Sequence, residues 1–285
     1  LRAILLMEAD FNFANKQVYG VGMLENVRKY KLMPDEFFSK KMRTSTDGSM
    51  AKVLFYDIVR QIRLPAGISS VDASNCYDRI AHAIASLIFL SCGVPETAVK
   101  CMLEAIQNMK FFLRTAFGDS KSSAGSSIRI KTQGLCQGNG AAPAGWCVIS
   151  ITIIRAHKEK GHGAHFLAPV SAVRQHFAGI LFVDDTDLLH LNMETEETVE
   201  QAFEAIQTST LNWGKLLIAT GGTLKPIKCC YHLISFEWKH DGTWTYASHH
   251  EDESATLFVP MHDGSLAPID HLSVDTAKKT LGTMS

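Results

Sequence analysis

The chain has 285 residues, enough for one large domain or two lobes, and 46% of them are hydrophobic, which supplies a sizeable core. No stretch reaches the roughly 18 uncharged apolar residues of a membrane span, and the first residues are too short and too soon charged for a secretory signal. Seven cysteines, two of them adjacent, indicate a reducing, intracellular compartment. The net charge of -1 conceals an asymmetry, because residues 1–183 hold 22 Lys and Arg against 13 Asp and Glu, and residues 184–285 hold 6 against 16. A basic amino-terminal region suits a polyanion, although a dipolar solvated surface gives the same split.

Apolar residues at helical spacing predict that residues 1–65 are mainly helical. Pro34 is expected to open one of these helices, with acidic residues in its first turn. The basic cluster at residues 40–43 is either a solvated face or a contact for phosphate.

Residues 67–72 predict a short strand that ends in Asp72, and a helix rich in Ala, Ile and Leu follows up to a C-cap at Gly93. An acid at the end of a strand, with a helix just beyond, lies where ligands gather in open sheets. A helix N-cap gives the same pattern. Tyr77, five residues later, would lie beside anything that Asp72 binds, and a buried core Tyr would look the same.

After a long helix from Pro95, residues 111–117 are expected to form a strand whose hairpin partner is 128–131. The chain then reaches a run of small residues that contains Gln137 and Gly138. Small residues that open a helix leave the backbone free to approach a flat substrate. Glycines before a helix are also ordinary loop chemistry.

The turn between residues 178–183 and 188–191 carries two adjacent acids, Asp184 and Asp185. Two apolar runs separated by a short polar segment predict a tight β-hairpin with the acids at its tip. Neighbouring acids repel and resist sharing a dry site unless cations neutralise them, and Mg²⁺ takes one or two carboxylates. A solvated turn is the alternative, since Asp is a favoured turn residue.

The histidines near this turn match no zinc spacing and are expected at the surface: His157, His162, His165, His176 and His190. Thr195 is expected to cap the helix that follows the turn. A strand over 229–236 and a hairpin with Asp241-Gly242 at its tip come next.

Three motifs in order now resemble the palm of reverse transcriptases, closest to those encoded by retrotransposons. They are an Asp with Tyr five residues on, Gln-Gly with Pro six residues after the Gln, and an aromatic-x-Asp-Asp hairpin. The resemblance covers about residues 40–285. It implies an α+β right-hand polymerase fold, with an antiparallel palm sheet backed by helices, a mainly helical fingers portion and no thumb. Residues 1–66 would be an N-terminal fingers segment, and 67–285 a palm with a fingers insertion around 94–135, ending at the start of the primer-grip region at Leu281-Gly282.

The resemblance also assigns roles to single residues. Two Mg²⁺ ions, with Mn²⁺ as a substitute, would be held by Asp72, Asp184 and Asp185. Lys228 would protonate or neutralise the leaving group, although a strand-edge Lys looks the same. Four residues would border the nucleotide or template, with the first as the steric gate under the incoming sugar: Tyr77, Gln137, Gly138 and Phe182.

The implied activity is that of a retroelement RNA-directed DNA polymerase, which transfers a nucleotide from dNTP to a primer 3′-hydroxyl. Its partners would be an RNA template and a DNA or RNA primer. The sequence departs from the commonest pattern at Phe182, Val183, Cys136 and Ala142, and no thumb or other retroelement domain is present in it. One alternative is a non-catalytic nucleic-acid-binding remnant of a transposon. A second alternative is an RNA-dependent RNA polymerase, but Tyr77 argues against it. A third is an unrelated metal-dependent hydrolase, which would leave the Gln-Gly stretch unexplained.

Overall fold

The computed structural model describes residues 4–125, 131–247, 256–274, 276, 279–280 and 283–284. The chain forms two compact units. The first contains Leu1–Met33, Asn75–Thr152 and Thr220–Gly222, and the second contains Pro34–Ser74, Ile153–Ala219 and Thr223–Ser285. These boundaries differ from the division at residue 66 expected from the sequence, and the assignment of fingers and palm stays a prediction.

Helices make up most of the first unit and cover both faces of the sheet in the second. The helical segments are α1 (Ala9–Asn15), the π-helix η1 (Lys16–Met23), α2 (Leu24–Lys29), α3 (Ser45–Ile62), α4 (Cys76–Arg79), α5 (His82–Ser91), α6 (Glu96–Asn108), α7 (Ala142–Glu159), α8 (Val199–Ala219) and the 3₁₀ turn η2 (Pro226–Lys228). None of the helices in the described part of the chain is both long and apolar enough to cross a membrane.

The strands are short, and most of the longer ones lie in the second unit. They are β1 (Ala66–Asp72), β2 (Lys110–Phe111), β3 (Arg114–Thr115), β4 (Gly118–Asp119), β5 (Ala124–Gly125), β6 (Ala164–Leu167), β7 (Arg174–Phe177), β8 (Gly179–Phe182), β9 (Asp185–Asn192), β10 (Cys230–Ile234), β11 (Phe236–Trp238), β12 (Trp244–Tyr246), β13 (Phe258–Pro260), β14 (Leu266–Pro268), β15 (Asp270–His271), β16 (Lys279–Thr280) and β17 (Thr283–Met284).

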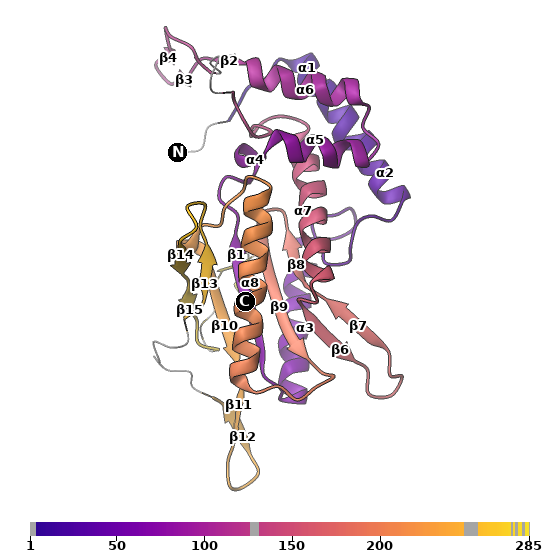
Figure 1. Ribbon diagram of the computed structural model, residues 1–285, viewed down its shortest axis with the longest axis vertical. Coiled ribbons are helices and arrows are strands. Elements are labelled where there is room, and N and C mark those ends of the chain that lie inside the picture. The colour runs from indigo at the N-terminus through magenta and orange to yellow at the C-terminus, as the bar shows by residue number, and fades with distance from the viewer. Residues whose placement is uncertain are drawn as a thin grey trace. The chain divides into compact units, whose positions relative to one another are not determined.

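A seven-stranded sheet organises the second unit, in the order β15-β10-β1-β9-β6-β7, with β8 paired to β9 (Figure 1). The central pairs β10–β1, β1–β9 and β8–β9 are antiparallel, as the sequence predicts. The pairs β6–β9 and β10–β15 are parallel, so the sheet is mixed, whereas the resemblance implied an antiparallel sheet. Each parallel ladder joins only two residue pairs at the margin of the antiparallel core. Periodicity along one segment reveals a strand, but it does not give the direction in which distant strands pair.

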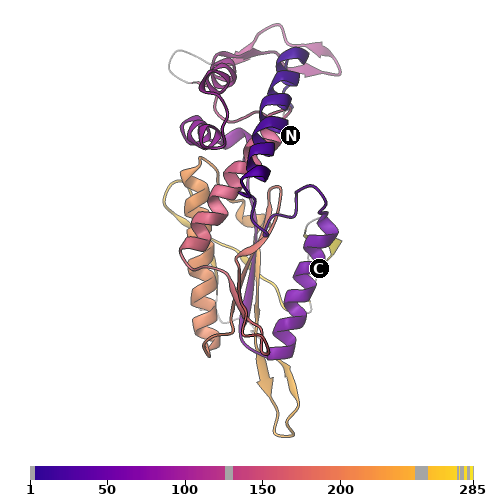
Figure 2. The ribbon, with the colours of Figure 1, turned by 90° about the vertical axis from the view of Figure 1, so that its right-hand side faces the viewer.

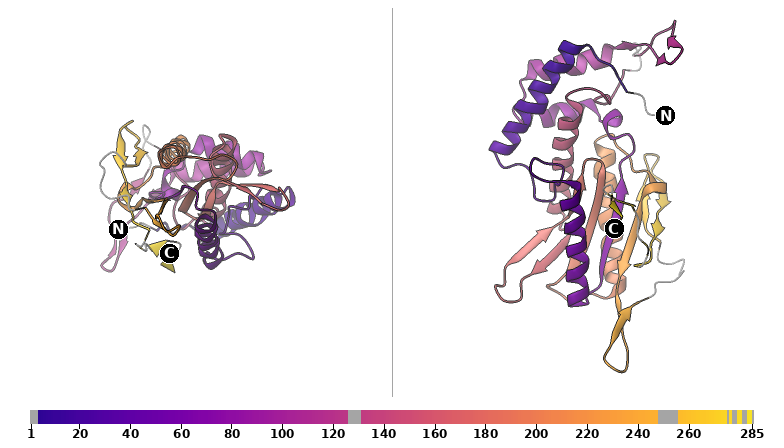
Figure 3. Two further views of the ribbon diagram at one scale, coloured as in Figure 1. Left: turned by 90° about the horizontal axis from the view of Figure 1, so that it is seen from below. Right: turned by 180° about the vertical axis from the view of Figure 1, so that it is seen from behind.

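The two faces of this sheet are covered by different helices (Figures 2 and 3). Because side chains alternate along a strand, one set of β1 and β9 residues packs against α3, and the other set faces α8. The α3 face forms a buried core that includes Ile68 of β1, Leu189 of β9, Ile180 of β8, and Phe55 and Val59 of α3. The acids described below lie at one end of this face.

The first unit is built on helix packing. Tyr19 of η1 meets Phe89 of α5 edge to face at 5.3 Å, and its hydroxyl donates to the carbonyl of Ala98 at 3.1 Å. The helix expected up to Gly93 is divided into α4 and α5, and Gly93 follows it with φ +82°, as a C-cap glycine should. The chain therefore ends this helix where the sequence predicts, but breaks it once on the way.

Three further expectations need correction. No helix starts at Pro34, because the following residues form turns in which Glu36 is buried and pairs with Lys158 at 2.5 Å. The N-cap of α8 is Thr198 and not Thr195, since the Thr198 hydroxyl accepts from the N–H of Gln201 at 3.3 Å. The strand expected to begin near Phe111 pairs within residues 110–125. Its expected partner at 128–131 lies largely outside the described residues, as does Leu281-Gly282.

Candidate active site

Two adjacent strands bring the predicted acids together. In the antiparallel register of β1 and β9, Asp72 lies directly opposite Asp185. The β8–β9 hairpin closes with Phe182 opposite Asp185, so that Val183 and Asp184 form a two-residue turn. The N–H of Ala73 donates to the carbonyl of Asp184 at 3.5 Å and joins the turn to the end of β1. Directly opposed residues have Cβ atoms roughly 4.5–5.5 Å apart, so these carboxylates share one end of the sheet.

The turn that carries the acids is strained at Val183, whose φ is +58°. A two-residue hairpin needs positive φ in its turn, and Gly, Asn or Asp usually supplies it. A β-branched residue in this region is a true outlier, because its Cβ crowds the backbone. Strain of this kind persists only where the surroundings enforce it, and it is concentrated at functional sites.

Lys228 completes the cluster. It ends η2, and the N–H of Lys225 donates to the carbonyl of Asp72 at 3.0 Å, which fixes this turn beside β1. The Lys228 ammonium donates to Asp72 Oδ2 at 2.7 Å, with 46% of the Lys side chain exposed. The Lys228 ammonium therefore contacts one of the three acids, and its catalytic role stays a prediction.

Asp185 has a strongly perturbed pKa. Burial, followed by the charges of Asp184, Asp72 and Asp187, raises its pKa to about 6, and Lys228 opposes this rise. The fold therefore holds several carboxylates close together against their mutual repulsion, which Lys228 offsets in part.

The donor set fits Mg²⁺ in kind. Three carboxylates come from two strands and one turn, and hard oxygen donors of this type are the ligands that Mg²⁺ prefers. Burial first, and then the neighbouring carboxylates, raise the pKa of Asp185, and a dication would relieve the repulsion among these acids. Across the described ranges, no three or more His, Cys, Asp or Glu side chains are already gathered around a metal position. Asp72, Asp184 and Asp185 are therefore candidates for holding Mg²⁺, and that assignment is a proposal.

A buried ion pair between Asp187 and Lys52 lies next to the acids, two residues further along β9 from Asp185, and was not predicted from the sequence. Asp187 faces Ser70 across β1 and β9, and the Ser70 hydroxyl donates to its Oδ1. The ammonium of Lys52, from α3, lies 3.3 Å from Asp187 Oδ2, with side-chain exposures of 1% and 3%. A signal was present, because Asp187 has the same parity along β9 as Asp185 and the core residue Leu189, and so belongs to the inward face.

Tyr77 and the Gln-Gly stretch meet within the first unit. Tyr77 is half-buried on α4, and its carbonyl accepts from the N–H of Leu135 at 2.7 Å. Asp78 Oδ1 accepts from the N–H of Gln137 at 3.2 Å. Gly134 allows this approach, since its φ is +81° and a Cβ there would lie 2.5 Å from the Asp78 backbone. The structure thus ties the segment that contains Gln137 to the helix that contains Tyr77.

Gly138 makes the close backbone approach that its sequence context predicts, but to the chain itself. Its φ is +109°, and a Cβ there would clash with the carbonyl oxygen of Leu5. The N–H of Leu5 donates to the carbonyl of Gln137 at 2.7 Å. Residues near the start of the chain therefore cover this stretch, and the roles of Gln137, Gly138 and Phe182 at a nucleotide or template stay predictions.

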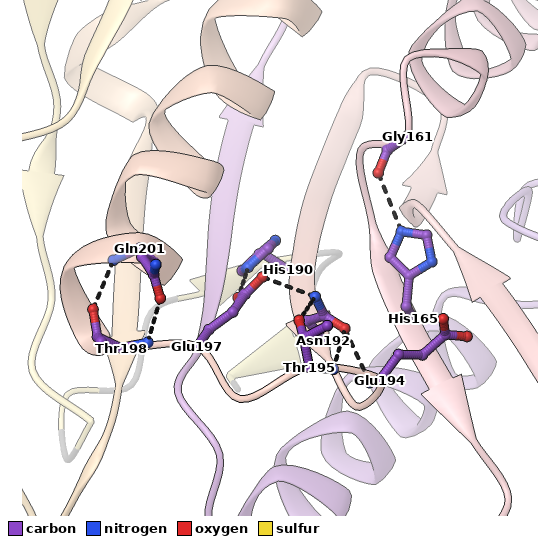
Figure 4. A network of polar contacts seen from close by, with 9 residues as sticks. All are labelled: Gly161, His165, His190, Asn192, Glu194, Thr195, Glu197, Thr198 and Gln201. Carbon is purple, nitrogen blue, oxygen red and sulfur yellow. Dashed lines mark hydrogen bonds and ion pairs between the residues drawn. The ribbon is translucent and has the colours of Figure 1, made fainter.

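The expectation that the five histidines lie at the surface is wrong for two of them. His157 is fully buried, between the side chains of Ser209 and Asn212 at 3.1 and 3.0 Å. His190, on β9, is 9% exposed and bonds to Glu197 at 2.9 Å (Figure 4). Glu197 also accepts from Asn192, and the network fastens the far end of β9 to the start of α8. These histidines are structural.

The comparisons with known proteins bear on the fold. No protein-family model matches the chain, and no curated protein sequence is similar to it. The solved structure of apo telomerase from Candida tropicalis, truncated from its C-terminal domain, is similar to it with a TM-score of 0.50 and 11% identity. This match covers 86% of the chain and 42% of that protein. Telomerase from Candida albicans, in complex with a fragment of telomeric RNA, gives 0.50 and 10%, over 82% of the chain and 34% of that protein.

The chain has a fold similar to that of these two telomerase structures. It spans less than half of the telomerase chains that it resembles, and at this identity the similarity concerns the fold alone. The fold expected from the sequence motifs is thus supported only as a mixed α/β architecture with a central mixed sheet. A retrotransposon origin is not part of what this likeness shows.

Proposed function

We propose that the chain carries the nucleotidyl-transfer site of a reverse transcriptase, which adds deoxynucleotides to a primer 3′-hydroxyl on an RNA template. The observation that carries the proposal is the β1–β9 register, which sets Asp72 opposite Asp185, next to the turn residue Asp184 that the Ala73 N–H joins to the end of β1. The solved Candida albicans telomerase has a similar fold and contains RNA, which supports RNA as a partner. The assignment to a retrotransposon rests on the sequence motifs.

The residues have separate tasks in this reaction. Asp72, Asp184 and Asp185 would hold Mg²⁺, which when bound stabilises the attacking and leaving oxygens of a phosphoryl transfer. Lys228 would donate a proton to the departing pyrophosphate or offset its charge, and its ammonium contact with Asp72 Oδ2 at 2.7 Å supports this role. Its present bond to Asp72 keeps it positioned beside the acids. The sequence resemblance alone assigns Tyr77, Gln137 and Gly138 to the sugar and the template.

The test replaces Asp184 and Asp185 together with Asn. Primer extension by the 285-residue chain, on a primed RNA template with Mg²⁺ and dNTP, should fall at least about a hundredfold. Binding of Mn²⁺, followed by electron paramagnetic resonance, should weaken in parallel and reports on the site without turnover. Asp57→Asn is the matched control, because Asp57 is an exposed acid in a surface pair with Arg60. A folded double variant with unchanged extension and unchanged Mn²⁺ binding would refute the proposal.

The choice of sugar separates a reverse transcriptase from an RNA polymerase. Tyr77→Val should raise the ratio of kcat/KM for ribonucleotides over deoxyribonucleotides about tenfold, because removing the ring opens space for a 2′-hydroxyl. Tyr77→Phe keeps the ring and should leave the ratio unchanged. A parent protein that already prefers ribonucleotides would favour the RNA polymerase alternative.

A further inference from the structure

A β-hairpin in the first unit, formed by residues 110–125 and here named the aromatic hairpin, exposes several large apolar side chains. Phe112 is 60% exposed, Leu113 67% and Phe117 101%, and Phe111 is 39% exposed. The hairpin extends away from α6 (Figure 1). Four such residues within seven positions form a surface patch, unlike the single exposed apolar residues that are normal in soluble proteins.

The hairpin is held by its own polar bonds. Arg114 forms a two-bond pair with Asp119, at 2.7 and 2.9 Å. The N–H of Leu113 donates to the Ser120 hydroxyl at 3.0 Å, and the N–H of Ser120 donates back to the Leu113 carbonyl at 2.8 Å. Isolated two-stranded hairpins are marginal in water, so bonds of this kind are needed to hold the rings out from the surface. These polar bonds stabilise the hairpin without covering the aromatic rings, which stay exposed to solvent.

The charges around the rings are mostly positive. Lys110, Arg114 and Lys121 lie in the hairpin with a single acid, Asp119, which is engaged by Arg114. Both lysines are exposed. Exposed aromatic rings among cations are the combination that binds single-stranded nucleic acid, in which bases stack on rings and phosphates meet Lys or Arg. An apolar protein partner would need no such charge.

We propose that the aromatic hairpin binds single-stranded RNA, with bases stacked on Phe112 and Phe117 and phosphates contacted by Lys110 and Lys121. This deepens the proposed function and rests on it for the choice of RNA, since a polymerase must hold the unpaired part of its template. Stacking tolerates any base, as copying an arbitrary template requires. The hairpin contributes binding and takes no part in the chemistry.

The test measures binding of a fluorescent 12-nucleotide oligouridine to the 285-residue chain by anisotropy, without Mg²⁺ or dNTP. Each ring lost should weaken binding at least about fivefold, so Phe112→Ala with Phe117→Ala should weaken it about 25-fold. Replacing both rings with Tyr should keep the affinity within about twofold, whereas replacing both with Leu should weaken it as Ala does. The Leu variant separates ring stacking from general apolar contact. Phe13→Ala is the matched control, because Phe13 is 63% exposed on α1.

The lysines are tested by the salt dependence. Lys110→Gln with Lys121→Gln should reduce the slope of log K against log salt by about 1.4, since each phosphate contact to a single strand contributes about 0.7. Unchanged affinity of the Ala variant, or full affinity of the Leu variant, would overturn the proposal. Unchanged RNA affinity with a shift in oligomeric state would overturn it in favour of a protein contact.

The two proposals fail in different ways. A parent chain that binds RNA through the hairpin but does not extend primers would contradict the polymerase function and leave the hairpin proposal in place. A parent chain that extends primers, with a double Ala variant that binds RNA equally well, would contradict the hairpin proposal alone.

Discussion

The buried pair of Lys52 and Asp187 gives the sharpest prediction about stability. Replacing Lys52 with Met removes the cation and leaves the Asp187 carboxylate in the core with the Ser70 hydroxyl. The double replacement Lys52→Met with Asp187→Leu removes both charges and keeps similar volumes. The two variants separate the cost of an unpaired buried charge from the net value of the pair.

The magnitudes follow from the geometry. At 3.3 Å the attraction is about 5 kcal/mol for an effective dielectric constant of 20. Transferring each ion from water to a site with at most 3% exposure costs several kcal/mol, which offsets most of this attraction. Lys52→Met should therefore lower the free energy of unfolding by about 3–5 kcal/mol. The free energy of unfolding of the double variant should equal that of the parent or exceed it by up to about 4 kcal/mol.

The assay is urea unfolding followed by circular dichroism at pH 7, with primer extension measured on the same preparations. Because Asp187 lies two residues from Asp185 on β9, the double variant should lose activity even when its stability is restored. Asp57→Asn, at an exposed pair, should change the free energy of unfolding by less than about 1 kcal/mol. A loss below about 1 kcal/mol for Lys52→Met would refute the reasoning, since it would mean that water reaches the pair.

Three other predictions concern the acid turn and the buried histidine. Asp185→Asn should raise the free energy of unfolding of the metal-free protein by about 1–2 kcal/mol at pH 8, after allowance for solvent screening, because the pKa of Asp185 is raised from 3.8 to about 6. The gain should shrink as the pH falls through 6 and vanish well below 3.8, where the carboxyl is protonated in both folded and unfolded states. A loss of stability at pH 8 would contradict this. Burial lowers the pKa of His157 from 6.5 to about 3, so the neutral ring contributes stability above pH 6.5 that is lost as the pH falls towards 3. Between pH 7 and 5, the free energy of unfolding of the parent, measured in urea, should fall by about 2 kcal/mol more than that of His157→Gln. Equal decreases would show that His157 is solvated. Val183→Gly should change the free energy of unfolding by less than about 1 kcal/mol, because relief of strain at φ +58° offsets the lost packing; a loss above about 2 kcal/mol would mean that the turn is unstrained.

Much of the site could be predicted from local sequence. The hairpin that carries Asp184 and Asp185 follows from two apolar runs and a polar turn, and the structure has it as β8 and β9. The strand before Asp72 follows from the same reasoning. In both cases the deciding information lies within about ten residues, where hydrophobic periodicity is strongest.

What the sequence could not give depends on contacts between distant segments. The partner of Asp187 lies on α3, 135 residues earlier, and an isolated Lys in a helix reads as a surface residue until the packing is known. The sequence places His157 at the surface for a similar reason, because its burial depends on the partners Ser209 and Asn212, which lie on α8. The parallel margins of the sheet also arise from segments far apart in the chain.

The rungs between β1 and β9 explain how mutually repelling acids remain on a stable sheet. At the far end of the α3 face the opposed pairs are apolar, as with Ile68 and Leu189, and they belong to the buried core. The next rung on this face, Ser70 with Asp187, is polar and is neutralised from α3 by Lys52. The last rung sets Asp72 against Asp185, at the half-buried end where Lys228 and solvent can reach. Along this face the opposed residue pairs thus become more polar from the core towards Asp72 and Asp185. Burial of the apolar pairs fixes β1 and β9 against each other, and this holds Asp72 and Asp185 together at the end of the sheet.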